Sequence, residues 1–251
     1  MAILRLGSGG DEVTRLHAAL HANLPGWTRY FMIDVFNSTT LDAVKLFQKQ
    51  ACIQVDGLVG PQTKSALGMS ITGRPYTHRV RLHFRSLTLT NVPFTRILAS
   101  TQLVFAQYGI KVDYASGESL GLSPADAAKF QTINGSCEWT ITSGEYAELQ
   151  RSGTSAPISD IIVYYVDQFS ENINGCGGHL RARPACVVAK AGTRWCTAHE
   201  VCHVLLGSTF NPVHMAPTSN LMHSVDIQRS TPTLTAAQLT GIKASHLCRT
   251  I

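Results

Sequence analysis

The first 70 residues carry three stretches whose apolar residues recur with the spacing of helices. In the first stretch they fall every three or four positions, which places them on one helical face: Val13, Leu16, Leu20 and Leu24. The second stretch begins at Thr40 and has the same kind of face: Ala43, Val44 and Phe47. After a turn that begins at Asp56, Pro61 is placed to open a short third helix through Leu67. The pattern predicts a three-helix domain over residues 1–70.

From about residue 76 onward the pattern changes to strands separated by helices, after a linker with Gly and Pro in residues 69–80. Strands are predicted where apolar residues alternate or run on continuously: 79–90 (with a bulge), 110–114, 158–166 and 184–190. Helices are predicted from their starting residues and apolar spacing: Pro93–Gln107, a short one from Ser123, and Thr235–Leu247. The remainder, 76–251, is therefore predicted to be a second, larger α+β domain.

A mostly apolar helix is predicted from Thr197 to Gly207, and it contains the pattern H-E-x-x-H. His199 and His203 stand four residues apart, so both imidazoles lie on one helical face and can hold one Zn²⁺. Glu200 lies one step round the helix, where its carboxylate can take a proton from an attacking water without binding the metal. The pattern favours metal-assisted peptide hydrolysis.

Downstream of this helix the chain has His214 and then Asn220-Leu221-Met222. With the helix, these residues resemble the metzincin clan of zinc endopeptidases, whose signature is H-E-x-x-H-x-x-G-x-x-H followed by a methionine turn. The resemblance implies a set of site residues in which three histidines bind zinc, one glutamate is the general base and one methionine forms the turn: His199, His203, His214, Glu200 and Met222.

The spacing departs from that signature, because His214 is eleven residues after His203 instead of six. His223 and Asp226 therefore remain alternative third ligands. Some metzincins have a tyrosine two residues after the turn methionine; Ser224 stands there, so no residue is given that role.

The predicted order of elements also resembles the metzincins. It implies a metzincin-like α/β zincin domain with a mixed, mostly parallel sheet. In that family the strand before the active helix forms the edge of the cleft and pairs with an extended substrate; here that strand would be Pro184–Lys190.

The N-terminal unit has its own resemblance, over residues 3–68. It rests on Leu4-Arg-Leu-Gly-Ser-Gly-Gly, on Phe47-Gln48 and on the turn Asp56-Gly-Leu-Val-Gly-Pro-Gln-Thr. These segments look like the three-helix peptidoglycan-binding domain of bacterial wall hydrolases, which implies peptidoglycan as a partner. The family repeats the turn internally; here the repeat is Asp34–Thr40, with Asp34 and Asn37 in place of glycines. Asp and Asn tolerate the left-handed backbone better than most residues.

Composition narrows the choice of partners and location. The chain has 251 residues, 44% of them hydrophobic and 15% charged, with a net charge of +5. No apolar run approaches the ~18 residues that span a bilayer, and the Lys and Arg residues are scattered, so neither a membrane span nor nucleic-acid binding is predicted. The N-terminus lacks the pattern of a signal peptide. We expect a secreted, cell-wall or periplasmic protein. Delivery by a dedicated secretion system, release during phage lysis and a trimmed secreted enzyme all fit the sequence.

The cysteines and a second histidine pair leave alternatives open. Seven cysteines contain no C-x-x-C pair, and the odd number leaves at least one free thiol. Cys176 and Cys186 either bridge a loop or stay reduced. His17 and His21 also stand four apart, but without a Glu between them or a nearby third ligand; an ordinary helix face is the favoured interpretation over a metal site.

Two functions follow from these observations. The first is a zinc-dependent endopeptidase, targeted to the bacterial cell wall, that hydrolyses peptide bonds in proteins or in peptidoglycan peptides. The alternative is a non-catalytic wall-binding protein with a structural zinc site. Glu200 separates them, because a structural site is closed by four ligands and has no use for a general base.

Overall fold

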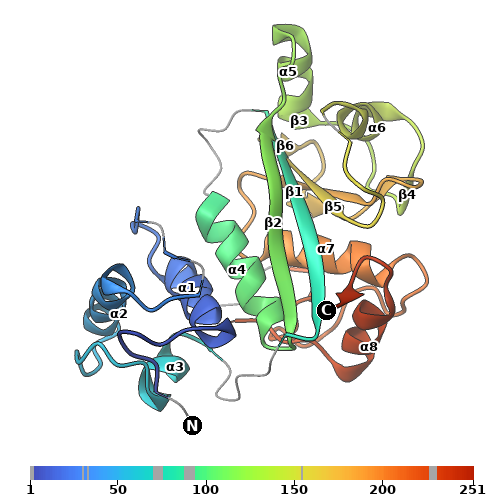
Figure 1. Cartoon of the computed structure of the whole chain (residues 1–251). Helices are drawn as coiled ribbons and strands as arrows, with labels where there is room; N and C mark the ends of the chain where they lie inside the picture. Colours follow the sequence, from blue (N-terminus) through green and yellow to red (C-terminus); the bar gives the residue numbers. More distant parts are fainter. Residues whose placement is uncertain are drawn as a thin grey trace. The chain divides into compact units, whose positions relative to one another are not determined.

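The structure is a computed structural model, in which residues 3–29, 31–32, 34–69, 76–87, 94–153, 155–225 and 231–251 are described (Figure 1). The chain divides into two compact units. The first unit comprises residues 1–77 and 94–111, and the second comprises residues 78–93 and 112–251. None of the helices in the described residues is both long and apolar enough to cross a membrane.

The N-terminal unit contains the three predicted helices, α1 (Asp11–Asn23), α2 (Ser38–Gln50) and α3 (Pro61–Ala66). Asn37 begins α2 through a capping box, in which its side chain accepts from the Thr40 backbone N–H at 3.0 Å and the Thr40 hydroxyl accepts from the Asn37 N–H. Asn37 has φ −100°, so the residue that replaces the family's glycine is extended and serves as a helix cap. The helix cap explains why the substitution is compatible with the fold.

Gln48 links α2 to the turn that precedes α3. Its side-chain amide is buried and donates to Asp56 Oδ1 at 2.8 Å, to the Leu58 carbonyl at 2.9 Å and to Thr63 Oγ1 at 3.1 Å. Its carbonyl accepts from the Gly57 N–H at 2.9 Å. Gly57 has φ +74°, a backbone conformation that favours glycine. This network explains why the Phe47-Gln48 and Asp-Gly segments occur together in the sequence.

Helix α4 (Phe94–Ala106) belongs to the first compact unit, where it packs on α1. The predicted helix is therefore present, although its predicted first residue, Pro93, lies outside the described residues. The sequence had grouped this helix with the second domain. Because α4 packs on α1, truncation before residue 76 would separate two helices that contact each other. The boundary between residues 70 and 76 stays a prediction.

The second unit is built on a mixed sheet, which contains six strands in the described part of the chain (Figure 1). Its order is β10 (Arg249–Thr250), β1 (His78–Ser86), β5 (Ile161–Val166), β9 (Ala185–Ala189) and β7 (Gly175–Cys176), with β2 (Ile110–Ser119) also paired to β1. Strands β1, β5 and β9 are parallel, whereas β10 and β7 are antiparallel to their neighbours. The predicted mixed α+β architecture is confirmed.

The predicted position of one strand in the sheet is wrong. Residues 184–190 were expected to form the edge of the cleft, but β9 pairs with β5 on one side and with β7 on the other. All five residues of β9 are buried. Strand β7 lies at that end of the sheet instead, and a two-residue strand is too short to be recognised from apolar periodicity.

Short elements enclose one end of this unit. They comprise α5 (Pro124–Gln131), α6 (Gly144–Arg151) and two small parallel pairs, β3 (Thr132–Ile133) with β6 (Gln168–Phe169) and β4 (Thr140–Ile141) with β8 (His179–Leu180). Their apolar side chains join those of β5 and β9 in one core cluster. Helix α7 (Cys196–Leu206) packs on β9, β5 and β7, and α8 (Ala236–Ala244) packs on α7.

Candidate metal and catalytic site

Helix α7 is the element that positions the candidate site, as the sequence predicts. It is buried along nearly its whole length. Gly207 ends it with φ 71°, and the Gly207 N–H donates to the His203 carbonyl at 2.9 Å. The first two histidines are therefore held on a rigid, packed helix.

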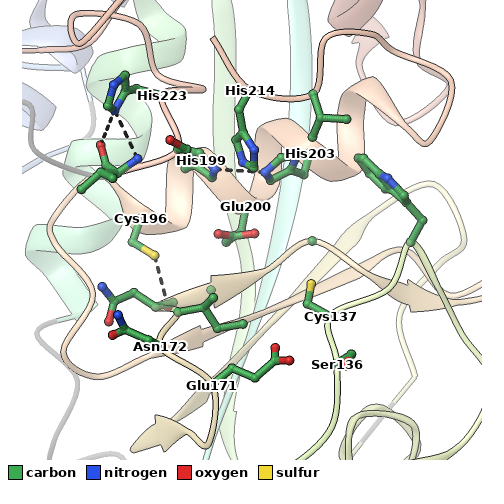
Figure 2. Close-up of a pocket in the computed structure, with 18 of the residues that line it drawn as sticks. Ser136, Cys137, Glu171, Asn172, Cys196, His199, Glu200, His203, His214 and His223 are labelled. Atoms are coloured by element: carbon green, nitrogen blue, oxygen red, sulfur yellow. Dashed lines mark hydrogen bonds between the residues drawn. The ribbon is translucent and has the colours of Figure 1, made fainter. Parts of the chain in front are cut away.

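His199 and His203 bring two ring nitrogens together. Their Nε2 atoms lie 3.0 Å apart, and both residues are 8% exposed (Figure 2). His199 Nδ1 lies 2.7 Å from the Leu221 carbonyl oxygen, which can only accept, so Nδ1 carries the proton. His199 Nε2 is then a bare lone pair that faces His203. A pair of this kind suits a shared proton or a cation between the two nitrogens.

His214 completes a group of three. One ring nitrogen from each of His199, His203 and His214 lies within 4.8 Å of the others, and this is the metal-type cluster that the described residues contain. The ring centroids of His214 are 5.4 Å from His199 and 5.0 Å from His203. His223 lines the same cavity but is not in the group, and its Nδ1 lies 2.8 Å from the Val225 carbonyl oxygen.

The protonation states of these histidines suit a metal. Burial lowers the pKa of His199 to about 4 and the pKa of His203 to about 2, and it also lowers the pKa of the more exposed His214. All three imidazoles are therefore neutral at pH 7 and can offer lone pairs. Zinc–nitrogen bonds of about 2.0–2.1 Å in a tetrahedron separate the nitrogens by about 3.3 Å, which is close to the 3.0 Å between the His199 and His203 Nε2 atoms. The donor set fits Zn²⁺. Asp226, the other alternative ligand, lies outside the described residues.

The turn around Met222 is tied to the histidines. Its side chain is fully buried, and its N–H donates to Asn220 Oδ1 at 2.8 Å. Asn220 and Gln238 are both buried and exchange two amide hydrogen bonds of 3.0 and 3.1 Å, which anchor the turn to the start of α8. Because the turn also supplies the Leu221 carbonyl, it fixes the orientation of the His199 ring.

Glu200 faces the strand side of the site. It is 6% exposed and lines a cavity of about 630 Å³ that the three histidines also line (Figure 2). Two glycines leave room for α7: a Cβ on Gly175 would lie 2.3 Å from Glu200 Oε1, and one on Gly177 would lie 2.4 Å from His203 Cβ. Any larger residue at these positions would displace the carboxylate or the histidine.

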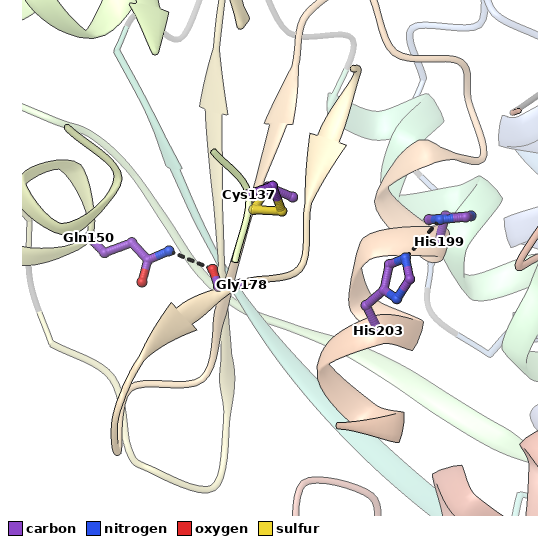
Figure 3. Close-up of a disulfide and its surroundings, with 6 residues drawn as sticks. Cys137, Gln150, Gly178, His199 and His203 are labelled. Carbon is purple, nitrogen blue, oxygen red and sulfur yellow. Dashed lines mark hydrogen bonds between the residues drawn. A yellow bond between two sulfur atoms is a disulfide. The ribbon is translucent and has the colours of Figure 1, made fainter. Parts of the chain in front are cut away.

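A disulfide holds the opposite wall of the cavity. Cys137 and Cys176 are bonded, with their Cα atoms 5.6 Å apart (Figure 3). The predicted alternative of a Cys176–Cys186 bridge is wrong, because Cys186 is a buried free thiol in β9. Two residues after Cys137, the Trp139 ring meets the His203 ring edge-on, with centroids 5.6 Å apart. The loop that carries Trp139 is thus covalently attached to β7.

Sequence reasoning missed the residues that build this wall. Glu171, Trp139 and the disulfide partners come from segments without a strong apolar period. A signal was present in Gly175-Cys176-Gly177-Gly178, because a run of glycines in a strand region indicates close approach of another backbone or side chain. A Cβ on Gly178 would meet the Glu138 carbonyl at 1.8 Å, which illustrates that approach.

Comparison with known proteins bears on the N-terminal part. Residues 9–67 match the family of peptidoglycan binding domains, so the chain carries a peptidoglycan-binding domain at its N-terminus. Among solved structures, the chain is similar to the L,D-transpeptidase from Xylanimonas cellulosilytica, with 29% identity and a TM-score of 0.25. The match covers 33% of this chain and 41% of that chain. With a TM-score this low, the similarity says nothing about the chemistry of the candidate site.

Proposed function

We propose that the protein is a zinc-dependent endopeptidase that its peptidoglycan-binding domain brings to the bacterial cell wall. One observation carries the proposal: three neutral imidazoles converge within 4.8 Å beside the buried carboxylate of Glu200, and all four residues line one open cavity. A metal site with three protein ligands and an accessible cavity has the character of catalytic zinc sites.

Each residue of the site has a role in this proposal. His199, His203 and His214 hold the metal, and the Met222 turn fixes the His199 ring through the Leu221 carbonyl. When bound, Zn²⁺ would act as a Lewis acid on the scissile carbonyl. Glu200 accepts a proton from the attacking water and later donates it to the leaving amine.

The walls of the cavity position the substrate. Strand β7 is paired to β9 on one side within the described sheet, and in this proposal an extended peptide lies beside β7. The disulfide Cys137–Cys176 fixes this strand to the Trp139 loop. The substrate is a protein or a peptide of peptidoglycan, and the peptidoglycan-binding domain raises its local concentration. The proposed location is the cell wall, the periplasm or the exterior of the cell.

The second candidate is a wall-binding protein with a purely structural zinc site. Such a site is closed by a fourth protein ligand. Among the residues that the structure describes, the cluster holds three histidines, and Glu200 and the cavity lie beside it. This arrangement supports the catalytic candidate.

The test is incubation of the zinc-loaded chain with purified peptidoglycan and, separately, with a denatured protein, followed by mass spectrometry. We expect new peptide termini in at least one of the two samples and none after chelation. Intact substrates in both samples, with zinc bound, would favour the structural site.

A further inference from the structure

The charged residues in the wall of the cavity are all acidic. The described lining residues include Glu138, Glu171 and Glu200, and no Lys or Arg is among them. The chain as a whole is basic, with 21 Lys and Arg residues against 16 Asp and Glu residues. Without a metal ion, the charge of the cavity lining is therefore opposite in sign to the net charge of the chain.

Two of these carboxylates are unusual for this chain, because they have no partner among the residues that the structure describes. Outside the cavity each glutamate is held by another residue: Glu12 by Lys64, Glu118 by Arg85, Glu145 by the Asn134 N–H and Glu148 by Lys129. Glu138 and Glu171 are exposed and form no ion pair or side-chain hydrogen bond with any residue that the structure describes. Their negative charge is left for something that enters the cavity.

Glu171 is the better placed of the two. It follows β6 in a turn closed by a hydrogen bond from the Ile173 N–H to the Glu171 carbonyl, at 2.8 Å. Figure 2 shows its carboxylate directed into the cavity from the side opposite the histidines, with Glu200 between them. Glu138 lies next to Cys137, whose disulfide fixes that segment to β7. Both residues thus line the cavity beside β7.

We infer that the cavity selects peptides that carry a free primary ammonium group close to the scissile bond, and that Glu171, assisted by Glu138, is the specificity-determining residue. This inference rests on the proposed peptidase function. Its substrate class is a peptide with an unblocked lysine-like diamino acid or a free N-terminal amine near the cut. The ammonium group would donate to a carboxylate that has no competing partner among the described residues.

The experiment compares peptides that differ only in the amine. Lysine, Nε-acetyllysine and norleucine are placed in turn at each position of a peptide that the zinc-loaded chain cleaves. At one position or more, the free amine should lower KM by about 3- to 10-fold relative to acetyllysine at low salt, with little change in kcat. Glu171→Gln should remove most of this preference, and Glu138→Gln should reduce it. Glu148→Gln, a glutamate outside the cavity, is the matched control and should leave the preference intact.

A binding measurement separates this inference from the peptidase proposal. Hexalysine and fully Nε-acetylated hexalysine are titrated into the Glu200→Gln chain by calorimetry, since the net charge of +5 disfavours non-specific binding of a cation. Tighter binding of hexalysine that is lost in Glu200→Gln/Glu171→Gln supports the inference even if no peptide is ever cleaved. Equal cleavage of lysine and acetyllysine peptides at every position, unchanged by Glu171→Gln, would overturn it while leaving the peptidase intact.

Discussion

Two helices of this protein carry histidines four residues apart, and only one pair has the surroundings of a metal site. His17 and His21 lie on α1, and His199 and His203 lie on α7. The spacing, and therefore the placement on one helical face, is the same in both. What differs is the partner that each ring meets.

On α1 the rings are used for packing. His17 Nε2 is 2.9 Å from the Thr40 hydroxyl, and the His17 ring stacks on Phe31 at 4.4 Å. The His21 ring meets Phe31 edge-on at 4.6 Å. Phe31 therefore contacts both rings of this pair. The α1 pair is not in the metal-type cluster of the described residues.

On α7 the two rings face each other and a third histidine, with a carboxylate beside them. A histidine pair at helical spacing therefore gains its chemical role from the groups that the tertiary structure brings to it.

Replacement of the general base should have the largest effect. Glu200→Gln keeps the size of the side chain but cannot accept a proton, so we expect a loss of about 10²-fold or more in hydrolysis. Zinc content should be unchanged, because the proposal gives Glu200 no bond to the metal. Peptide cleavage and metal content measured on the same preparation check both halves. Full activity of this variant would contradict the mechanism.

Substitution of the two cavity glycines, Gly175 and Gly177, should have the second-largest effect on activity. Gly175→Ala should push the Glu200 carboxylate aside and lower activity by about 10-fold or more with zinc retained, since small displacements of catalytic groups are costly. Gly177→Ala meets the Cβ of His203 instead, so it should weaken zinc binding as well.

The matched control for these variants is Gly121→Ala, where an added Cβ meets nothing within 4 Å. It should behave as the unmodified protein does. Wild-type activity in Gly175→Ala would mean that Glu200 tolerates displacement and that its position is not critical.

The packing of α4 on α1 predicts the result of truncation. A fragment of residues 76–251 exposes the apolar face of α4 that α1 covers, so its melting temperature should fall by several degrees relative to the full chain. The fragment should also lose retention on insoluble peptidoglycan, because it lacks residues 9–67. Circular dichroism and sedimentation with sacculi measure the two effects. An unchanged melting temperature would place the domain boundary at residue 76.

Acid should lower the free energy of unfolding of the metal-free protein, because His199 and His203 bind protons less readily in the folded state. The folded-state pKa values of His199 and His203, about 4 and about 2, lie below the unfolded value of about 6.5. Between these values the unfolded chain binds more protons, so the free energy of unfolding should fall as pH drops from about 7 towards 4. Urea unfolding of the chelated protein at several pH values measures this slope. If the pH dependence of the free energy of unfolding is the same in His199→Gln/His203→Gln, the dependence arises from other groups.

The sequence predicted the parts of the fold that have strong local patterns. The helices α1, α2 and α7 and the buried strands β5 and β9 were found because apolar residues recur along them, and H-E-x-x-H placed the candidate metal site on α7. The edge strand β7 was missed because two residues carry no period. The partner of Cys176 was also missed, since it is 39 residues away and only the tertiary fold brings it close.

The third ligand shows the same limit. The sequence left His214, His223 and Asp226 as alternatives, because the length of a loop does not determine where its side chains point. The structure brings His214 to the α7 pair, and the role of His214 in metal binding is still a proposal.

Metal content of matched histidine variants tests the central claim most directly. Elemental analysis after zinc loading should find about one zinc per chain in the wild-type protein and in His17→Ala/His21→Ala, and almost none in His199→Ala/His203→Ala. His214→Ala should also lose zinc, whereas His223→Ala should keep it. Zinc that survives in His199→Ala/His203→Ala, or disappears in His17→Ala/His21→Ala, would contradict the assignment of the metal site to α7.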